Sequence, residues 1–246
     1  MKEKEKKIMG VLNIPQLPKY KATLPSTGKD IYFRPITYRE ESFLLQLNQV
    51  KETDVLADNI LNIVDNCLYD VDRTKLTTTD ITWLFLQIRK ASISDTIEVG
   101  YRCLRKDKDG KECDTLTPYI ININDVKVEG DREFDYEIDL GEGAKYKLYF
   151  SEPPYLENKE KKETIDVLYA FFNRIENLED GNVYTKEDIS EDEFKELFMN
   201  VPIKDVVELA SRRNRLYRVT HKGTWKCSKC GNTEEIVTEG LFDFFG

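Results

Sequence analysis

Trp225-Lys-Cys-Ser-Lys-Cys-Gly231 is the stretch that most constrains the fold, because it places two thiols in one tight turn beside a glycine. A Cys-x-x-Cys-Gly turn lets both sulfurs face one metal ion. Cys103 and Cys113 flank a polar mid-chain segment whose Asp109-Gly110 dipeptide is typical of a hairpin turn. Structural zinc ions are commonly held by four thiolates. The sequence therefore predicts a zinc site that clamps the C-terminus to mid-chain, with the ligands Cys103, Cys113, Cys227 and Cys230.

The sequence leaves other interpretations of these cysteines open. A redox-active Cys-x-x-Cys usually opens a helix, whereas Glu234–Thr238 beyond this one is strand-like. Disulfides need an oxidising compartment, and the lysine-rich start Met1–Lys7 lacks the apolar core of a signal peptide. The thiols could also be independent buried or free groups. His221 could replace one sulfur as a ligand, and Cys67, in an apolar helical stretch, is expected to be core.

Composition limits the possible classes of protein. The chain has 246 residues, 40% hydrophobic and 34% charged, which suffices for a buried core in one large domain or two small ones. The net charge of −9 argues against nonspecific binding to DNA or RNA. Arg212–Arg218 is the only dense basic cluster, and we interpret it as a solvated helix end. No apolar run reaches the roughly 18 residues of a membrane span, so we expect a soluble protein.

The first third of the chain is expected to combine a strand pair with helices. Proline-rich sequence from Gly10 to Arg34 predicts an extended arm followed by two strands. Helical periodicity then predicts helices that begin at Thr37, with Glu40 completing a capping box, at Val55, and at Thr79 or Asp80. The buried stripe of the third helix is expected to be Ile81, Leu84, Phe85 and Ile88.

In the rest of the chain the spacing of apolar residues changes twice, from helical to strand-like and back. Residues 94–150 alternate with a period of two, which predicts antiparallel strands at 96–103, 113–123, 125–129, 134–139 and 144–150. Helices are expected at about 163–178, 190–199 and 202–218. Strands and helices do not alternate, so the predicted class is α+β, with an N-terminal helical block, a central antiparallel sheet, C-terminal helices and a zinc-ribbon-like hairpin cluster.

These elements suggest a division of the chain into successive regions. The expected regions are an extended arm at 1–20, a strand pair plus helical domain at 21–93, an antiparallel β region with half of the zinc site at 94–150, a helical region at 151–218, and a zinc knuckle with an aromatic tail at 219–246.

The sequence shows no catalytic constellation. The chain has one histidine, which nearly removes the commonest acid or base. Gly141-x-Gly143 lacks the third glycine and the following helix of a phosphate-binding loop, so we interpret it as a turn. A zinc ion held by four thiolates has no open position for water. We expect a structural or interaction protein without enzymatic activity or a small-molecule substrate.

Several blocks of the sequence, in order, resemble one protein family. The blocks are Leu24–Leu45, which reads Leu-Pro-Ser-Thr-Gly-Lys-Asp-Ile-Tyr-Phe-Arg-Pro-Ile-Thr and ends in Leu-Leu, then Ile63–Cys67, Leu76–Ser92, and the terminal Cys-x-x-Cys-Gly with Asp243-Phe-Phe245. Together they resemble the baseplate hub assembly family of T-even-type contractile-tailed bacteriophages. The resemblance covers about residues 20–120 well and the extreme C-terminus moderately, and residues 125–220 carry no matching motif.

The resemblance implies a component of the tail baseplate hub, made in the cytoplasm of the host bacterium. Its partners would be other hub or wedge proteins, and it would either stay in the virion tail or act as an assembly chaperone that is absent from the mature virion. Two alternatives from other classes are a zinc-ribbon adaptor that binds nucleic acid and an unrecognised hydrolase.

Both ends of the chain carry apolar residues suited to partner binding. Pro15 and Pro18 prevent the arm from forming a helix, but an extended arm can lie on another protein. The aromatic tail either docks onto the zinc hairpin of its own chain or binds a partner. The expected partner-binding residues are Val11, Leu12, Ile14, Leu17, Phe242, Phe244 and Phe245.

Overall fold

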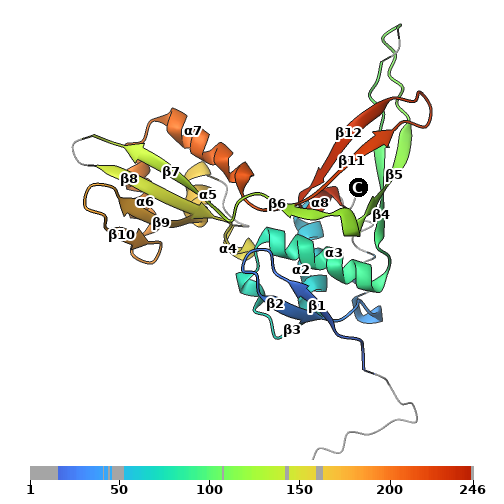
Figure 1. Cartoon of the computed structure of the whole chain (residues 1–246), viewed down its shortest axis with the longest axis horizontal. Coiled ribbons are helices and arrows are strands. Elements are labelled where there is room, and N and C mark those ends of the chain that lie inside the picture. Colours follow the sequence, from blue (N-terminus) through green and yellow to red (C-terminus); the bar gives the residue numbers. More distant parts are fainter. Residues whose placement is uncertain are drawn as a thin grey trace, which may run out of the picture.

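The computed structural model describes residues 16–40, 42–43, 45, 53–106, 108–141, 144–158 and 163–244. It is a mixed α+β fold, as expected, but its strands form several small antiparallel sheets and not one central sheet. Figure 1 shows a helical lobe, a lobe of projecting β-ribbons, and a third lobe in which a sheet packs with helices. No helix in the described ranges is long and apolar enough to cross a bilayer.

The helical lobe holds the strand pair and helices expected from the first third of the chain. A small antiparallel sheet in the order β1-β2-β3 packs against two helices. The elements are β1 (Tyr20–Thr23), β2 (Asp30–Phe33), the 3-10 helix η1 (Tyr38–Glu40), α2 (Thr53–Cys67), β3 (Leu68–Tyr69), the 3-10 helix η2 (Arg73–Lys75) and α3 (Thr78–Ser92). A helix was also expected to begin at Thr37, and half of residues 37–50 lie outside the described residues. The described part contains η1 and helical residues at 42, 43 and 45.

Helix α3 begins earlier than the sequence suggested. Its N-cap is Thr77, whose side chain accepts a hydrogen bond from the Asp80 amide at 3.1 Å. Asp80, at position N3, completes a capping box, because its carboxylate accepts a hydrogen bond from the Thr77 amide at 3.2 Å. The expected cap at Thr79 or Asp80 was therefore wrong. Asp80 also accepts from the Ser26 hydroxyl at 2.6 Å, which ties the β1–β2 turn to the start of the helix.

The apolar stripe of α3 is confirmed. Ile81, Leu84, Phe85 and Ile88 are all 2% exposed or less and lie in the core of the helical lobe. Leu86, on another face of α3, is also fully buried, but it packs in a separate apolar cluster with Val219 and Phe244. Because α3 contributes to both clusters, it joins the helical lobe to the ribbon lobe.

Leu84 provides a direct test of this packing. Leu84→Ala should lower the free energy of unfolding by about 2–5 kcal/mol, because the side chain is fully buried and its removal leaves a cavity. The same substitution at Leu104, which is 66% exposed, is the control and should cost less than about 0.5 kcal/mol. Urea denaturation measures both. Equal losses in the two variants would contradict the core role of Leu84.

The ribbon lobe is built from two long hairpins. Strands β4 and β5 pair with each other, and β11 lies between β12 and β6. The elements are β4 (Thr96–Arg102), β5 (Leu116–Asn122), the 3-10 helix η3 (Ile123–Asp125), β6 (Lys127–Glu129), β11 (Arg218–Lys226), β12 (Thr233–Glu239) and α8 (Gly240–Asp243). The hairpins lie side by side in Figure 1, with their loops at the same end of the lobe.

The third lobe contains a four-stranded antiparallel sheet in the order β10-β9-β8-β7. Its elements are β7 (Glu133–Asp139), β8 (Lys145–Ser151), α4 (Tyr155–Asn158), α5 (Thr164–Phe171), β9 (Phe172–Asn177), β10 (Val183–Thr185), α6 (Glu191–Met199), α7 (Ile203–Arg212) and the 3-10 helix η4 (Arg213–Arg215). An apolar core that includes Phe150, Phe172 and Phe194 joins the sheet to these helices.

Sequence periodicity misplaced parts of this region. The helix expected at 163–178 ends at Phe171, because residues 172–177 form β9 and pair with both β8 and β10. The helix expected to reach Arg218 ends at Arg212, since the chain turns through η4 into β11. The strands expected between 94 and 150 as one sheet belong to three sheets, because β6 joins β11, and β7 and β8 join β9 and β10.

The two termini differ in what the structure describes. Phe244, which we expected in the partner-binding set, is 1% exposed and packs with Leu86 and Val219, so its ring serves the core of this chain. It does not join the cluster beside the cysteines. Leu17 is 46% exposed. The expected partner-binding residues Val11, Leu12, Ile14 and Phe245 and the side chain of Phe242 lie outside the described residues.

Candidate metal centre

The loop between β4 and β5 brings Cys103 and Cys113 together. Beyond the paired strands, the Cys103 amide donates to the Thr115 carbonyl at 3.0 Å, and the Asp114 amide donates to the Cys103 carbonyl at 3.0 Å. The Cys113 amide donates to the Arg105 carbonyl at 2.8 Å. Asp114 adopts a left-handed φ of 51°, and Asp114 and Thr115 together lie opposite Cys103, as in a β-bulge. The ladder thus continues past the strand ends and places the two thiols across from each other.

The loop between β11 and β12 holds the second pair of thiols. The Cys227 amide donates to the Asn232 carbonyl at 2.8 Å, and the Gly231 amide donates to the Cys227 carbonyl at 3.1 Å. Gly231 has a φ of +69°, a conformation that glycine adopts without steric cost. This closed turn is the knuckle predicted from Cys-x-x-Cys-Gly.

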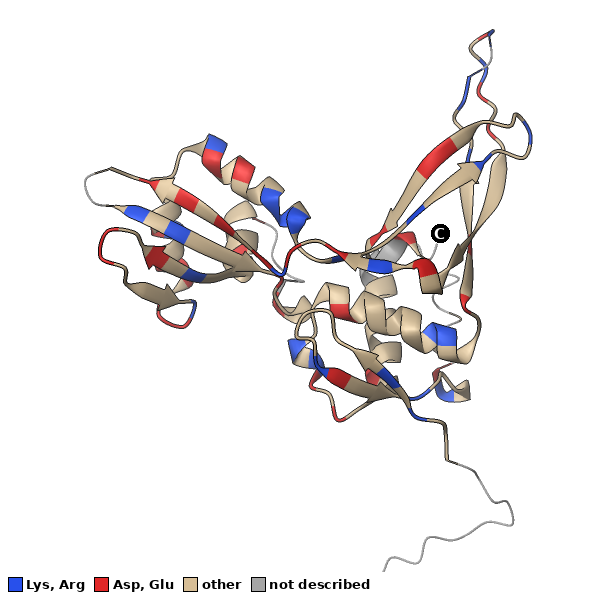
Figure 2. Ribbon diagram, viewed as in Figure 1, with Lys and Arg blue, Asp and Glu red and all other residues tan. Residues whose placement is uncertain are grey.

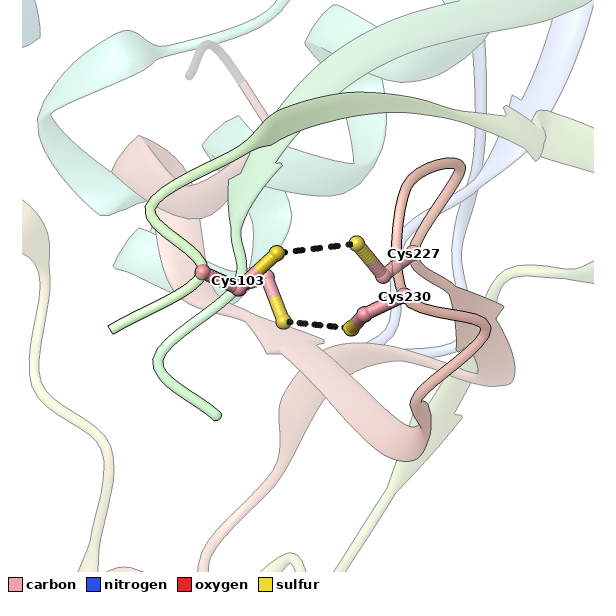
Figure 3. Close-up of side chains that lie close together, drawn as sticks. Cys103, Cys227 and Cys230 are labelled. Carbon is pink, nitrogen blue, oxygen red and sulfur yellow. Dashed lines mark hydrogen bonds between the residues drawn. The ribbon is translucent and has the colours of Figure 1, made fainter. Parts of the chain in front are cut away.

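The four sulfurs converge between the two loops. The Sγ atoms of Cys103 and Cys230 lie 3.6 Å apart and those of Cys113 and Cys227 lie 3.8 Å apart, and all four lie within 4.8 Å of one another. Figure 3 shows the sulfurs of Cys227 and Cys230 facing those of the opposite loop. A tetrahedral zinc ion with Zn–S bonds of about 2.3 Å requires sulfurs about 3.8 Å apart. The donor set and its spacing therefore fit one thiolate-bound metal ion.

The cluster is buried on one side and open on the other. Cys103 and Cys227 are at most 1% exposed, Cys113 is half-buried and Cys230 is exposed. Trp225 and Ile236 pack against the buried side. Access from solvent at Cys230 leaves a route by which a metal ion can enter.

Thr117 on β5 ties the two hairpins together beneath the sulfurs. The Trp225 indole donates to the Thr117 carbonyl at 3.2 Å, and the Ser228 amide donates to the Thr117 hydroxyl oxygen at 3.2 Å. The hydroxyls of Thr117 and Ser228 also lie 3.0 Å apart. Sequence reasoning missed this clamp, because Thr117 gives no local signal that it will meet the knuckle. It shows that contacts other than the sulfurs also hold the two loops in register.

The thiols differ in their readiness to ionise. Hydrogen bonds from the backbone amides of Cys230 and Lys229 lower the pKa of Cys227 to about 6, although burial opposes this. At Cys103, an amide hydrogen bond from Arg105 lowers the pKa, but burial and the neighbouring thiols outweigh it and raise the pKa to about 12. At neutral pH the knuckle therefore presents a thiolate. A divalent cation would favour ionisation of the other thiols.

The structure also bears on the other interpretations of the cysteines and of His221. All five cysteines lie in the described part of the chain and all are free thiols. Cys67 is fully buried, and burial raises its pKa to about 11, which confirms its assignment to the core. His221 is 6% exposed, its Nε2 lies 3.2 Å from the Tyr119 hydroxyl, and its ring does not join the four sulfurs. Its role as an alternative ligand is therefore not supported.

The chain is similar to a known protein family. A family model described as T4 bacteriophage base plate protein matches residues 17–246. No curated protein and no solved structure shows significant similarity to the chain. The matched range includes all four clustered cysteines and also spans residues 125–220, in which the sequence showed no recognisable motif.

Proposed function

This chain belongs to the T4 bacteriophage base plate protein family, and on that premise we propose that it is a structural or assembly component of the baseplate hub of a contractile-tailed phage. It works through contacts with other hub or wedge proteins and catalyses no reaction. The family match across residues 17–246 carries the proposal. The resemblance of Leu24–Leu45 and Leu76–Ser92 to hub assembly proteins supports the hub over other parts of the baseplate.

The metal centre has a structural role in this proposal. Zinc bound by the four clustered cysteines joins the β4–β5 loop to the β11–β12 loop. Four thiolates saturate a tetrahedral zinc ion and leave no position for a substrate or a reactive water. The ion therefore fixes the relative position of two projecting hairpins, and the hairpins offer a rigid surface to partner proteins.

The N-terminal arm is the proposed strapping element. Val11, Leu12 and Ile14 are apolar, and prolines in the same stretch of sequence disfavour a helix. Leu17, at the start of the described chain, is 46% exposed. Partner proteins of a baseplate can cover such a segment along its whole length. At the other terminus, the burial of Phe244 leaves Phe242 and Phe245 as the candidate contacts of the tail.

The arm can be tested by substitution. A triple variant with Val11, Leu12 and Ile14 each changed to Ser should no longer co-purify with hub proteins from infected cells, because its apolar contacts are removed. Its unfolding transition should be unchanged, since β1 begins only at Tyr20. A matched triple variant with Lys2, Lys4 and Lys6 changed to Ser should still co-purify. Normal co-purification of the first variant would refute the strapping role.

Mass spectrometry of purified virions distinguishes the two forms of the proposal. A resident hub subunit should be present in mature particles, whereas an assembly chaperone should be present in baseplate intermediates only. Absence from both particles and intermediates would contradict the proposed function in either form.

A further inference from the structure

A cationic surface cavity adjoins the metal centre. It has a volume of about 520 Å³ and opens where Cys113 and Cys230 approach the surface. We call it the cation pocket, and it is lined by Arg105, Lys106, Lys108, Lys111 and Lys229, together with Glu112 and the two cysteines. Figure 2 shows basic segments on both loops that form this end of the ribbon lobe. Such a concentration of positive charge is unexpected on a chain with a net charge of −9.

Several of these cations are available to a ligand. Lys106 faces Glu112 at 3.5 Å, but both side chains are about half exposed and such pairs are weak. In the described part of the chain, Arg105, Lys108 and Lys229 form no ion pair. The negative charge of the thiolates does not balance all of these cations. The three cations that form no ion pair carry one more charge than the two net negative charges of a zinc–tetrathiolate centre.

We propose that the cation pocket binds an acidic segment of another baseplate protein, rich in Asp and Glu. This inference rests on the proposed function, which supplies proteins as the partners. Carboxylates match the unpaired lysines and arginine in charge and hydrogen bonding. A nucleic acid strand fits less well, because the residues lining the pocket include no aromatic ring on which bases could stack.

The metal centre assembles this pocket from two distant segments. Arg105, Lys106, Lys108 and Lys111 belong to the β4–β5 loop, whereas Lys229 lies inside the knuckle between Cys227 and Cys230. The sulfurs that bind the ion come from the same two loops. The centre thus holds the two walls of the pocket at a fixed separation, which gives the structural ion a direct part in partner recognition.

The test uses the full-length, zinc-loaded protein and a fluorescein-labelled peptide of twelve glutamates at low salt. Fluorescence anisotropy should show binding, and Lys108→Gln with Lys229→Gln should weaken it about fivefold, because two exposed charge contacts are lost. The control, Lys29→Gln with Lys204→Gln, makes the same change in net charge at exposed lysines far from the pocket. It should bind like the wild type, and both double variants should retain zinc.

Three results would each overturn the pocket proposal. The wild type could fail to bind the peptide, the two double variants could bind it equally weakly, or a twelve-nucleotide oligothymidylate could bind more tightly than the peptide. Co-purification from infected cells distinguishes a failure of the pocket proposal from a failure of the proposed hub function. If the Lys108 and Lys229 variant still recovers hub proteins at wild-type levels, the cation pocket is not the docking site. If the wild type recovers none, the hub function itself is wrong.

Discussion

Cys227→Ser should release zinc and lower the melting temperature by on the order of 10 °C. Serine is a poor zinc ligand, and the free energy of binding a structural zinc ion is free energy of folding. Part of the ribbon lobe should survive, because the Thr117 clamp and the Trp225 cluster hold the hairpins without the sulfurs. Elemental analysis should give one zinc per wild-type chain and much less in the variant, and calorimetry measures the shift.

The ligand set has its own controls. Cys67→Ala removes a buried thiol outside the cluster, so it should keep one zinc per chain even though it alters the core. Ser228→Ala removes a hydroxyl between Cys227 and Cys230 without removing a sulfur, and it should also keep the zinc. Full zinc occupancy in a variant with both Cys103→Ser and Cys113→Ser would show that the two loops do not share an ion.

Arg34→Met should destabilise the helical lobe by about 3–5 kcal/mol, because it leaves a buried carboxylate without its cation. The Arg34 guanidinium contacts both oxygens of Glu40, at 2.7 and 3.1 Å, and Glu40 is 2% exposed. Arg34 also donates to the Asn66 carbonyl at 2.8 Å, near the C-terminus of α2. The substitution therefore removes an ion pair and a contact that joins β2 to the end of a helix.

The effect should depend on pH. Burial raises the pKa of Glu40, but hydrogen bonds from Arg34 and Thr37 outweigh it and lower the pKa from 4.5 to about 2. Because the pKa of Glu40 is lower in the folded chain than in the unfolded chain, its ionised carboxylate stabilises the fold at pH values above 4.5. This contribution, about 3 kcal/mol, is lost as the pH falls from 4.5 towards 2. Urea denaturation should therefore show a large difference between wild type and Arg34→Met at pH 7 and a small one near pH 2.

A double variant tests whether the unpaired charge of Glu40 causes the loss of stability in Arg34→Met. Glu40→Gln added to Arg34→Met removes the buried charge, so the double variant should be more stable than Arg34→Met alone. An exposed ion pair provides the comparison. Lys21 and Asp30 lie 2.7 Å apart but are about half exposed, so Lys21→Met should cost less than about 1 kcal/mol. Equal losses for Arg34→Met and Lys21→Met would contradict the importance of burial.

Features that depend on short-range patterns could be recognised from the sequence. The stripe of α3 repeats at helical spacing, and all four of its expected residues are buried. The knuckle follows from a spacing of two residues and a glycine, and the Asp109-Gly110 turn predicted that Cys103 would meet Cys113. The family could also be recognised, because its motifs are runs of adjacent residues.

Features that depend on distant partners required the tertiary structure. Residues 172–177 follow a helix without a break, and they form a strand because β8 and β10 supply hydrogen bonds on both sides. Phe244 is buried because α3 and β11 offer it an apolar site, and Thr117 meets Ser228 only when two hairpins lie side by side. Strand pairing and side-chain packing join residues far apart in the chain, so no local pattern encodes them. The four cysteines that cluster were therefore recognisable in the sequence, whereas the cation pocket beside them exists only because folding brings two loops together.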